Sequence, residues 1–260
     1  MKKLLLFALF AAGCGSGSYT PAPTTPVTPK ASVTGQYNLV LTSTNGRGTT
    51  NIYTNFTQTG KTFAGTANTL VCPANDLSQC QGDGAAAISI TPSGTVSGAN
   101  VTMTISFPNT AGADTVTMVG TATGTNLAGT YTDSLGDTGT WTASAAGSLS
   151  GNYSGTFNST SNPLSIPPTI LMTLAQDASL NLSGEATIMS SPCISSLTLS
   201  GQAIGGAFSL TDAASKAHII AVPGANGNSF TFSYNFESTA PQCAGDFGRG
   251  LVTNQDPWGY

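Results

Sequence analysis

The sequence predicts an all-β protein of two tandem antiparallel meander domains, each a small up-and-down barrel or a sandwich, after a signal peptide and a Pro/Thr-rich tether. Apolar and polar residues alternate through most of the chain, which is typical of strands with one buried and one solvated face. Short turns rich in glycine and asparagine separate these stretches, so consecutive strands are expected to pair as hairpins. The two halves also match each other in sequence, which indicates two related units.

Residues 1–13 are predicted to be a signal peptide. Lys2 and Lys3 precede an apolar run at 4–12, and small residues end the segment, as in exported proteins. The run is shorter than the about 20 apolar residues that a membrane-spanning helix needs. We therefore expect cleavage before Cys14.

Residues 11–14 are Ala-Ala-Gly-Cys and resemble the lipobox of bacterial lipoproteins. In that family the cysteine sulfur receives a diacylglycerol, the preceding peptide is removed and the new amino group is acylated. The resemblance implies a membrane anchor on Cys14, because two or more acyl chains hold a protein stably. Ala11 departs from the usual Leu, and an ordinary signal peptide with an incidental Cys14 is the alternative. Gly15 stands where retention in the inner membrane calls for Asp, so the resemblance favours the outer membrane over the inner membrane of the cell envelope.

Residues 14–34 are predicted to be the lipidated cysteine and a flexible tether. The segment consists mainly of Ser, Thr, Pro, Gly and Ala, and Lys30 is its single charge. Its prolines oppose a helix and favour an extended, polyproline-like chain. At about 3.1 Å per residue, such a tether would hold the folded part roughly 60 Å from the lipid surface.

The alternation of apolar and polar residues is clearest in four stretches, at 37–41, 101–107, 170–174 and 230–236. Turn signals lie at 45–46, 59–60, 98–100, 124–126 and 224–227. No part of the mature chain shows the apolar stripe of an amphipathic helix. These stretches are therefore predicted to be strands of antiparallel sheets.

An internal repeat divides the folded part of the chain. Three motifs recur in the same order, namely Gly-x-Tyr, Gly-x-Ala and Gly-Asp-x-Gly. The matching segments are 35–37 with 151–153, 63–67 with 182–186, and 136–139 with 245–248. We therefore predict two β domains, residues 35–147 and 151–260, with roughly eight strands each. One large sheet running through both halves is the alternative.

The cysteines are predicted to form two disulfides. If Cys14 carries lipid, four cysteines remain, an even number in an oxidising compartment. Cys243 precedes the Gly-Asp-x-Gly motif of the second half and has no counterpart in the first half, which instead holds Cys80 close to Cys72. The expected bridges are Cys72–Cys80 and Cys193–Cys243. By loop-closure entropy they would add about 2.6 and about 4 kcal/mol.

The segments 129–132 (Gly-Thr-Tyr-Thr) and 136–141 (Gly-Asp-Thr-Gly-Thr-Trp) are similar to a repeated β domain of uncharacterised bacterial lipoproteins. In that family, Gly-Thr-Tyr and Gly-Thr-Trp strands flank a glycine-rich turn. The resemblance covers most of residues 35–260 and implies tandem Gly/Thr-rich, lipocalin-like β domains without an established activity. Residues 249–251 (Arg-Gly-Leu) depart from the pattern, where a Thr-Trp strand is expected.

Composition argues against nucleic acid as a partner. Only 7% of the residues are charged, while 39% are hydrophobic and 31 residues are glycine. Loss of the signal peptide leaves five basic residues against eleven acidic ones. A mildly acidic chain without a basic stripe lacks the cations that a phosphate backbone requires.

The chain offers few groups for catalysis, so we predict no catalytic residue and no cofactor. General acid–base chemistry needs a group that exchanges protons near neutral pH, and His218 is the single histidine. Its neighbourhood predicts a strand position near a sheet edge, exposed or half-buried. The many serines occur without a Gly-x-Ser-x-Gly elbow.

Two pairs of carboxylates could in principle carry out glycosidase-type catalysis. They are Asp133 with Asp137, and Glu237 with Asp246. Both pairs lie around turns, where Asp normally caps backbone amides. Turn capping is therefore the predicted role.

No metal site is predicted. The four thiols lie in different halves and lack the paired short spacings of zinc sites. Asn75, Asp76 and Asp83 could surround calcium, but the spacing of an EF-hand is absent. A solvated loop is the simpler interpretation.

The aromatic residues Tyr131, Trp141, Trp258 and Tyr260 lie on or beside predicted strands. Sugar-binding sheets display exposed aromatic rings, but core packing is the commoner fate of such residues. We expect the tail at 257–260 to cover the open end of the second domain.

Two functions from different classes follow. The first is a membrane-anchored, non-catalytic structural or interaction module of the cell envelope, which presents loops to a protein or glycan partner. The second is a lipocalin-like carrier of a small apolar ligand, which needs a cavity of about 300 Å³ or more. A glycan-binding or glycan-cleaving module is a third. Phe107, Phe230, Phe232 and Phe236 are expected to point inward and to fill a small barrel, which favours the first.

Overall fold

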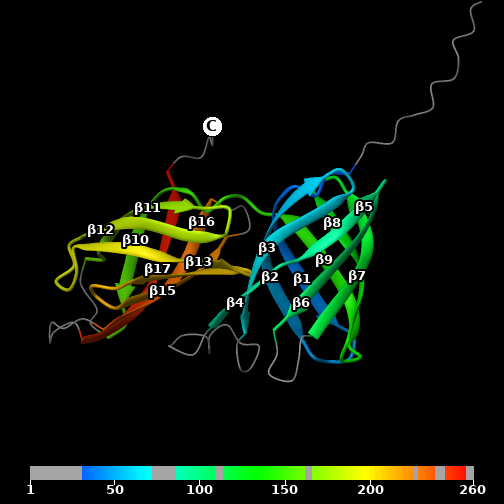
Figure 1. Cartoon of the computed structure of the whole chain (residues 1–260). Coiled ribbons are helices and arrows are strands. Elements are labelled where there is room, and N and C mark those ends of the chain that lie inside the picture. Colours follow the sequence, from blue (N-terminus) through cyan, green and yellow to red (C-terminus); the bar gives the residue numbers. More distant parts are fainter. Residues whose placement is uncertain are drawn as a thin grey trace, which may run out of the picture.

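The computed structural model describes residues 31–71, 86–108, 114–161, 166–224, 228–237 and 244–255. All regular secondary structure in these ranges is β-strand, arranged in two antiparallel sheets (Figure 1). The predicted all-β fold with two tandem units is confirmed, and each sheet closes into a barrel. The alternative of one continuous sheet is wrong, because the strand pairing within the described ranges never crosses from one half to the other. No helix of these ranges has the length and apolar character to cross a membrane.

The first barrel contains the strands up to residue 145. They are β1 (Gly35–Ser43), β2 (Thr49–Thr59), β3 (Thr62–Val71), β4 (Ala86–Ile90), β5 (Ser93–Ser97), β6 (Asn100–Phe107), β7 (Asp114–Thr123), β8 (Asn126–Asp133) and β9 (Thr138–Ala145). The sheet order is β2-β1-β9-β8-β7-β6-β5-β3-β4, and pairing of β2 with β3 closes the ring. β4 and β5 pair with opposite ends of β3. Pro92, which has no amide N–H, separates them, so together they fill one position in the ring.

The second barrel is a meander in which each strand pairs with the next. Its strands are β10 (Gly151–Ser159), β11 (Thr169–Gln176), β12 (Asn181–Met189), β13 (Ser196–Ile204), β14 (Ala207–Asp212), β15 (Ala217–Pro223), β16 (Ser229–Glu237) and β17 (Ala244–Asn254). The last strand pairs back with the first, and Gly250 lies opposite Phe157. The closing strand forms even though residues 249–251 depart from the expected motif.

Each barrel has its own core, built from every second residue of its strands. In the first barrel the largest side chains with under 2% exposure include Trp141, Phe56, Leu39 and Ile52. In the second barrel they include Phe208, and the whole set is rich in Phe, Tyr, Leu and Ile. The period-two alternation of the sequence is therefore the pattern of burial along the strands.

The end of the second barrel that carries the turns at 177–181 and 203–207 docks on the outer face of β2 and β3 (Figure 1). The amide Nδ2 of Asn55 donates to the carbonyl of Ala178 at 3.0 Å, and that of Asn68 donates to the carbonyl of Ala203 at 3.0 Å. Tyr53 points out of the first barrel and joins the core cluster of the second. The two barrels therefore share a buried contact.

Tyr53 closes the docked end of the second barrel. Its side chain is only 4% exposed, and its hydroxyl lies 2.9 Å from both the Oε1 of Gln36 and the carbonyl oxygen of Gly147. Gly205 approaches the backbone of Asn51 so closely that a Cβ there would lie 1.9 Å from the Asn51 carbonyl oxygen. Such backbone contact leaves little freedom for one barrel to move against the other.

Candidate functional site

Aromatic rings fill the interior of the second barrel. The ring centroid of Phe230 lies 4.8 Å from those of Tyr153 and Phe208, and the rings of Phe157 and Tyr234 meet edge to face at 5.1 Å. Phe230, Phe232 and Phe236 point inward as expected, whereas Phe107 of the first barrel is only partly buried. Aromatic side chains therefore pack against one another inside the second barrel.

A buried carboxylate lies at one end of the first barrel. Asp137, just before β9, is 5% exposed. It accepts hydrogen bonds from the hydroxyls of Ser43 at 2.7 Å and Tyr131 at 2.9 Å. The side-chain amide of Asn45 donates at 3.1 Å. These bonds join the end of β1 to the start of β9, at the pairing of the first and last strands of the barrel, which we call the seam.

The second barrel repeats this arrangement. Asp246 on β17 is 6% exposed and accepts from the hydroxyls of Ser159, Ser161 and Tyr234. The Ser161 bond is 2.5 Å and the Tyr234 bond is 3.3 Å. Each Gly-Asp-x-Gly motif therefore supplies one inward carboxylate at the seam of its barrel. The preceding glycine, Gly136 or Gly245, has φ of +84° or +71°, in the region that glycine adopts most readily.

The environment of each seam shifts the ionisation of its partners. Burial, followed by the hydrogen bond to Asp137, raises the pKa of Tyr131 to about 12. Burial opposes ionisation of Asp137, but the hydrogen bonds from Ser43 and Tyr131 outweigh it and hold the pKa below the usual range. Burial and the charge of Asp246 likewise raise the pKa of Tyr234. At neutral pH Tyr131 and Tyr234 are therefore neutral phenols, and Asp137 is a carboxylate.

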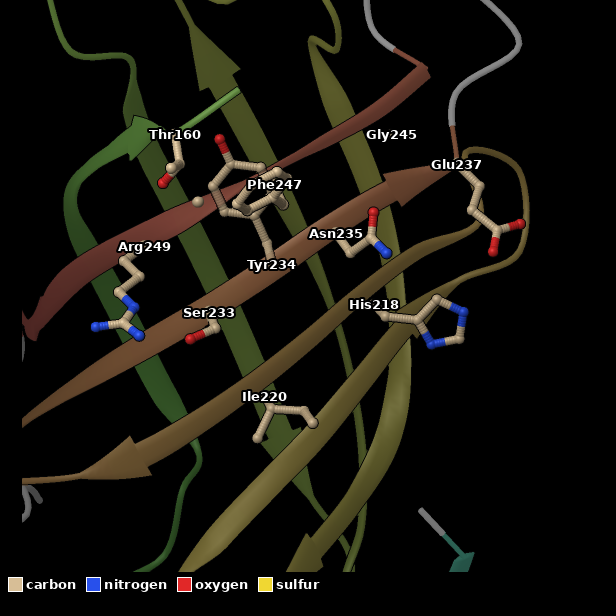
Figure 2. Close-up of a pocket in the computed structure, with 11 residues that line it drawn as sticks. Thr160, His218, Ile220, Ser233, Tyr234, Asn235, Glu237, Gly245, Phe247 and Arg249 are labelled. Atoms are coloured by element: carbon tan, nitrogen blue, oxygen red, sulfur yellow. The ribbon is translucent and has the colours of Figure 1, made fainter. Parts of the chain in front are cut away.

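A groove of about 660 Å³ lies on the outer face of the second barrel, over β15, β16 and β17 (Figure 2). Strand register places its side chains in two rows. One row is His218, Asn235 and Phe247, and the other is Ile220, Ser233 and Arg249. The remaining lining residues are Thr160, Tyr234, Glu237, Gly245 and Gly248. A site of this volume is in the size range of small-ligand pockets.

The groove is polar with one exposed aromatic ring. Phe247 is 49% exposed and lies on the outward face of β17. Gly248 contributes no side chain, and a Cβ there would lie 2.8 Å from the Tyr234 hydroxyl oxygen. The ring of the buried Tyr234 therefore packs against Gly248 on the inner side of the sheet.

The two carboxylate pairs considered for catalysis differ in the structure. Asp133 accepts from the backbone N–H groups of Leu135 and Asp137, which is the expected turn capping. Glu237 is exposed on the outside of β16, whereas Asp246 points inward. The pair of Glu237 with Asp246, considered above as a possibility, does not form, because alternation along neighbouring strands sends the two side chains to opposite faces.

His218 is half-buried on β15, as expected, but its predicted place near a sheet edge is wrong. β15 pairs with β14 on one side and β16 on the other, and the barrel is closed. In the described part of the chain, no group of three or more His, Cys, Asp or Glu residues is arranged to hold a metal ion.

Tyr131 and Trp141 are buried in the core of the first barrel. Cys193 is half-buried, takes part in a disulfide, and its N–H donates to Ser191 Oγ at 3.2 Å. The other residues singled out in the sequence lie outside the described ranges. They are Cys14, Cys72, Asn75, Asp76, Cys80, Asp83, Cys243, Trp258 and Tyr260. The pairings Cys72–Cys80 and Cys193–Cys243 therefore remain predictions.

Sequence reasoning missed the seam hydrogen bonds and the groove. The seam had a detectable signal, because the segments at 35–43 and 151–159 both begin Gly-x-Tyr and end in Ser with equal spacing. The groove had none, because its residues come from three strands and are ordinary outward positions.

Comparisons with known proteins give no family assignment. No known family matches the chain, and no curated protein matches it. Among solved structures, a protein of unknown function from the DUF3598 family of Nostoc punctiforme is 8% identical, with 85% of this chain and 94% of that chain covered and a TM-score of 0.26. Kievitone hydratase from Nectria haematococca is 10% identical, with 89% and 95% covered and a TM-score of 0.24. The Burkholderia oklahomensis agglutinin is 13% identical, with 86% of each chain covered and a TM-score of 0.19. The fold assignment rests on the strand pairing itself.

Proposed function

We propose that this protein is a lipid-anchored, non-catalytic interaction module of the bacterial cell envelope. The N-terminal segment supports the anchor, since residues 11–14 have the character of a lipobox and a Pro-rich tether follows. The disulfide at Cys193 supports export, because disulfides persist in oxidising compartments. Gly15 favours the outer membrane.

The observation that carries the interaction role is the contrast between the inside and the outside of the second barrel. Its interior is filled by aromatic rings that touch one another, which argues against the carrier alternative. Its outer face over β15–β17 exposes Val222, Phe247 and Leu251 at 41%, 49% and 51%. Register aligns these strands side by side, so the three apolar side chains share one face around the groove. Clustered exposed apolar residues mark interaction surfaces.

Cys14→Ala should release the protein into soluble fractions and abolish incorporation of labelled palmitate. The matched control, Ser16→Ala, leaves the lipobox intact and should behave as the wild type. Gly15→Asp should move the protein to inner-membrane fractions. Membrane association and labelling that survive in Cys14→Ala would contradict the anchor.

Native mass spectrometry of the purified protein tests the carrier alternative. With filled barrels, we expect the mass of the acylated chain alone. A further lipid or pigment bound in stoichiometric amount would favour the carrier.

A further inference from the structure

The groove over β15–β17 combines an apolar ring with planar hydrogen-bonding groups. Phe247 supplies the exposed ring, and Asn235 and Arg249 supply an amide and a guanidinium. Their side chains stand on the same face of the sheet (Figure 2). Among the described residues, Arg47 forms an ion pair with Asp133, whereas the guanidinium of Arg249 forms none. The groove thus holds donors and acceptors beside an apolar surface.

Three classes of ligand fit this groove poorly. An extended peptide that adds a strand needs a free sheet edge, but β15, β16 and β17 are each paired on both sides. A nucleic acid needs several cations, and Arg249 is the single Lys or Arg of the lining. An apolar ligand needs mainly apolar walls, whereas Ile220 and Phe247 are the only aliphatic or phenylalanine side chains there.

A carbohydrate suits a groove that combines one exposed aromatic ring with several hydrogen-bonding side chains. A sugar ring has an apolar C–H face and a rim of hydroxyls, each of which donates and accepts hydrogen bonds. An exposed aromatic ring covers the C–H face, and amide, carboxylate and guanidinium groups satisfy the hydroxyls. Glu237 and Arg249 also lie in different parts of the groove, on the outward rows of β16 and β17. Their opposite charges offset each other, which favours uncharged sugar units.

We propose that this groove binds a neutral polysaccharide chain, with one sugar ring on Phe247 and neighbouring hydroxyls on Asn235 and Arg249. The proposal rests on the proposed interaction role and names its partner class. The groove lies toward the end of the second barrel that carries Glu237 and Gly245, opposite the end that docks on the first barrel. Docking of the barrels therefore leaves it accessible.

The test uses the full-length acylated protein in phosphatidylcholine liposomes. The probes are cellohexaose and chitohexaose, measured by titration calorimetry, and purified peptidoglycan sacculi, whose peptide stems carry carboxylates, measured by co-sedimentation. The oligosaccharides represent neutral chains and the sacculi represent a charged one, so binding of the sacculi without either oligosaccharide would overturn the proposal. We expect at least one oligosaccharide to bind, and Phe247→Ala and Asn235→Ala each to weaken its binding at least tenfold.

Two controls separate recognition from folding. Phe247→Trp keeps an aromatic face and should retain binding. Leu171→Ala changes an exposed leucine on β11 of the same barrel, outside the groove lining, and should bind as the wild type. Binding should also change less than twofold between 50 and 500 mM NaCl, because the units are neutral. All variants should melt within about 2 °C of the wild type.

The outcomes are distinct. The proposal is overturned if the wild type binds none of the probes, if Phe247→Ala binds unchanged, or if binding falls steeply with salt, which would indicate an anionic ligand. Failure of the anchor is detected separately, by loss of palmitate labelling and of flotation with the liposomes.

Discussion

Phe232 on β16 lies directly opposite Gly250 on β17, and its ring occupies the space that a side chain at Gly250 would need. A Cβ there would lie 2.3 Å from the ring of Phe232. In the first barrel the same two strand positions hold Gly129 on β8 and Trp141 on β9. The aromatic residue and the glycine have thus exchanged strands between the two halves. This exchange explains why the second half lacks the Thr-Trp motif and still closes its barrel.

Gly250→Ala should destabilise the protein by about 2 kcal/mol, because the added methyl group overpacks the core against Phe232. Gly147→Ala is the matched control, since a Cβ there meets nothing within 4 Å. Thermal unfolding followed by circular dichroism would measure both. An unchanged melting temperature for Gly250→Ala would contradict the proposed packing.

Combining Gly250→Ala with Phe232→Ala should cost less than the sum of the two single changes, because the clash exists only while the ring is present. The rescue should be partial, since the new Cβ would also lie 2.8 Å from the Cβ of Phe157. Additive losses would show that the ring and the glycine are energetically independent.

Tyr53→Ala should lower stability by about 3–5 kcal/mol, because it empties a buried ring position in the core of the second barrel. Tyr53→Phe keeps the ring and should cost about 1 kcal/mol for the lost hydroxyl contacts. Differential scanning calorimetry should show one transition for the wild type and two for Tyr53→Ala. Two transitions in the wild type would mean that the barrels unfold independently.

Stability should fall at both ends of the pH scale because of the seam residues. The pKa of Asp137 is lower in the folded state, so its contribution is present above about pH 4 and is lost as the pH falls further. The pKa of Tyr131 is raised to about 12, so its contribution is present below about pH 10 and is lost as the pH rises toward 12. The measurement is melting temperature against pH.

Asp137→Asn should flatten part of the acid loss and cost about 2 kcal/mol at pH 7, because it removes hydrogen bonds to a charged acceptor. Tyr131→Phe should reduce the alkaline loss, and adding Tyr234→Phe should reduce it further, since the pKa of Tyr234 is also raised. An alkaline limb that is identical in the double variant would rule out these phenols as its source.

Peptide mapping without reduction should join Cys193 to Cys243 and Cys72 to Cys80. The ends of β12 at Met189 and of β16 at Glu237 lie at the same end of the second barrel, which suits the first bridge. Cys193→Ser should then lower the free energy of unfolding by about 4 kcal/mol by the loop-entropy estimate. A bridge between the two halves would refute the pairing.

Much of the fold could be predicted from sequence because the alternation is local. Val101, Met103 and Ile105 show every second residue apolar, and all three are buried in the barrel. The repeat of Gly-Asp-x-Gly predicted equivalent turns, and the structure gives both carboxylates equivalent hydrogen bonds. Whether the strands form a barrel or a sandwich depends on which strands pair when they are distant in the sequence. Local periodicity does not encode that pairing.

The barrel interface was not predictable by the same reasoning. Ile52, Tyr53 and Thr54 are consecutive and all buried, although alternation would leave one face solvated. Tyr53 is buried by the other barrel, a contact with no periodic signature. The groove was missed for a related reason, because His218, Asn235 and Phe247 become neighbours only once the strand register is known.

The docking of the barrels gives the molecule a direction. The chain enters the first barrel at Gly35, and the second barrel is attached through its end at 177–181 and 203–207, with the groove toward its other end. Order along the chain is therefore also order in space, from the start of the first barrel through the second barrel to the groove. The contact of Gly205 with Asn51 sets where the groove points relative to the first barrel. A change at that contact would redirect the groove without altering any residue that lines it.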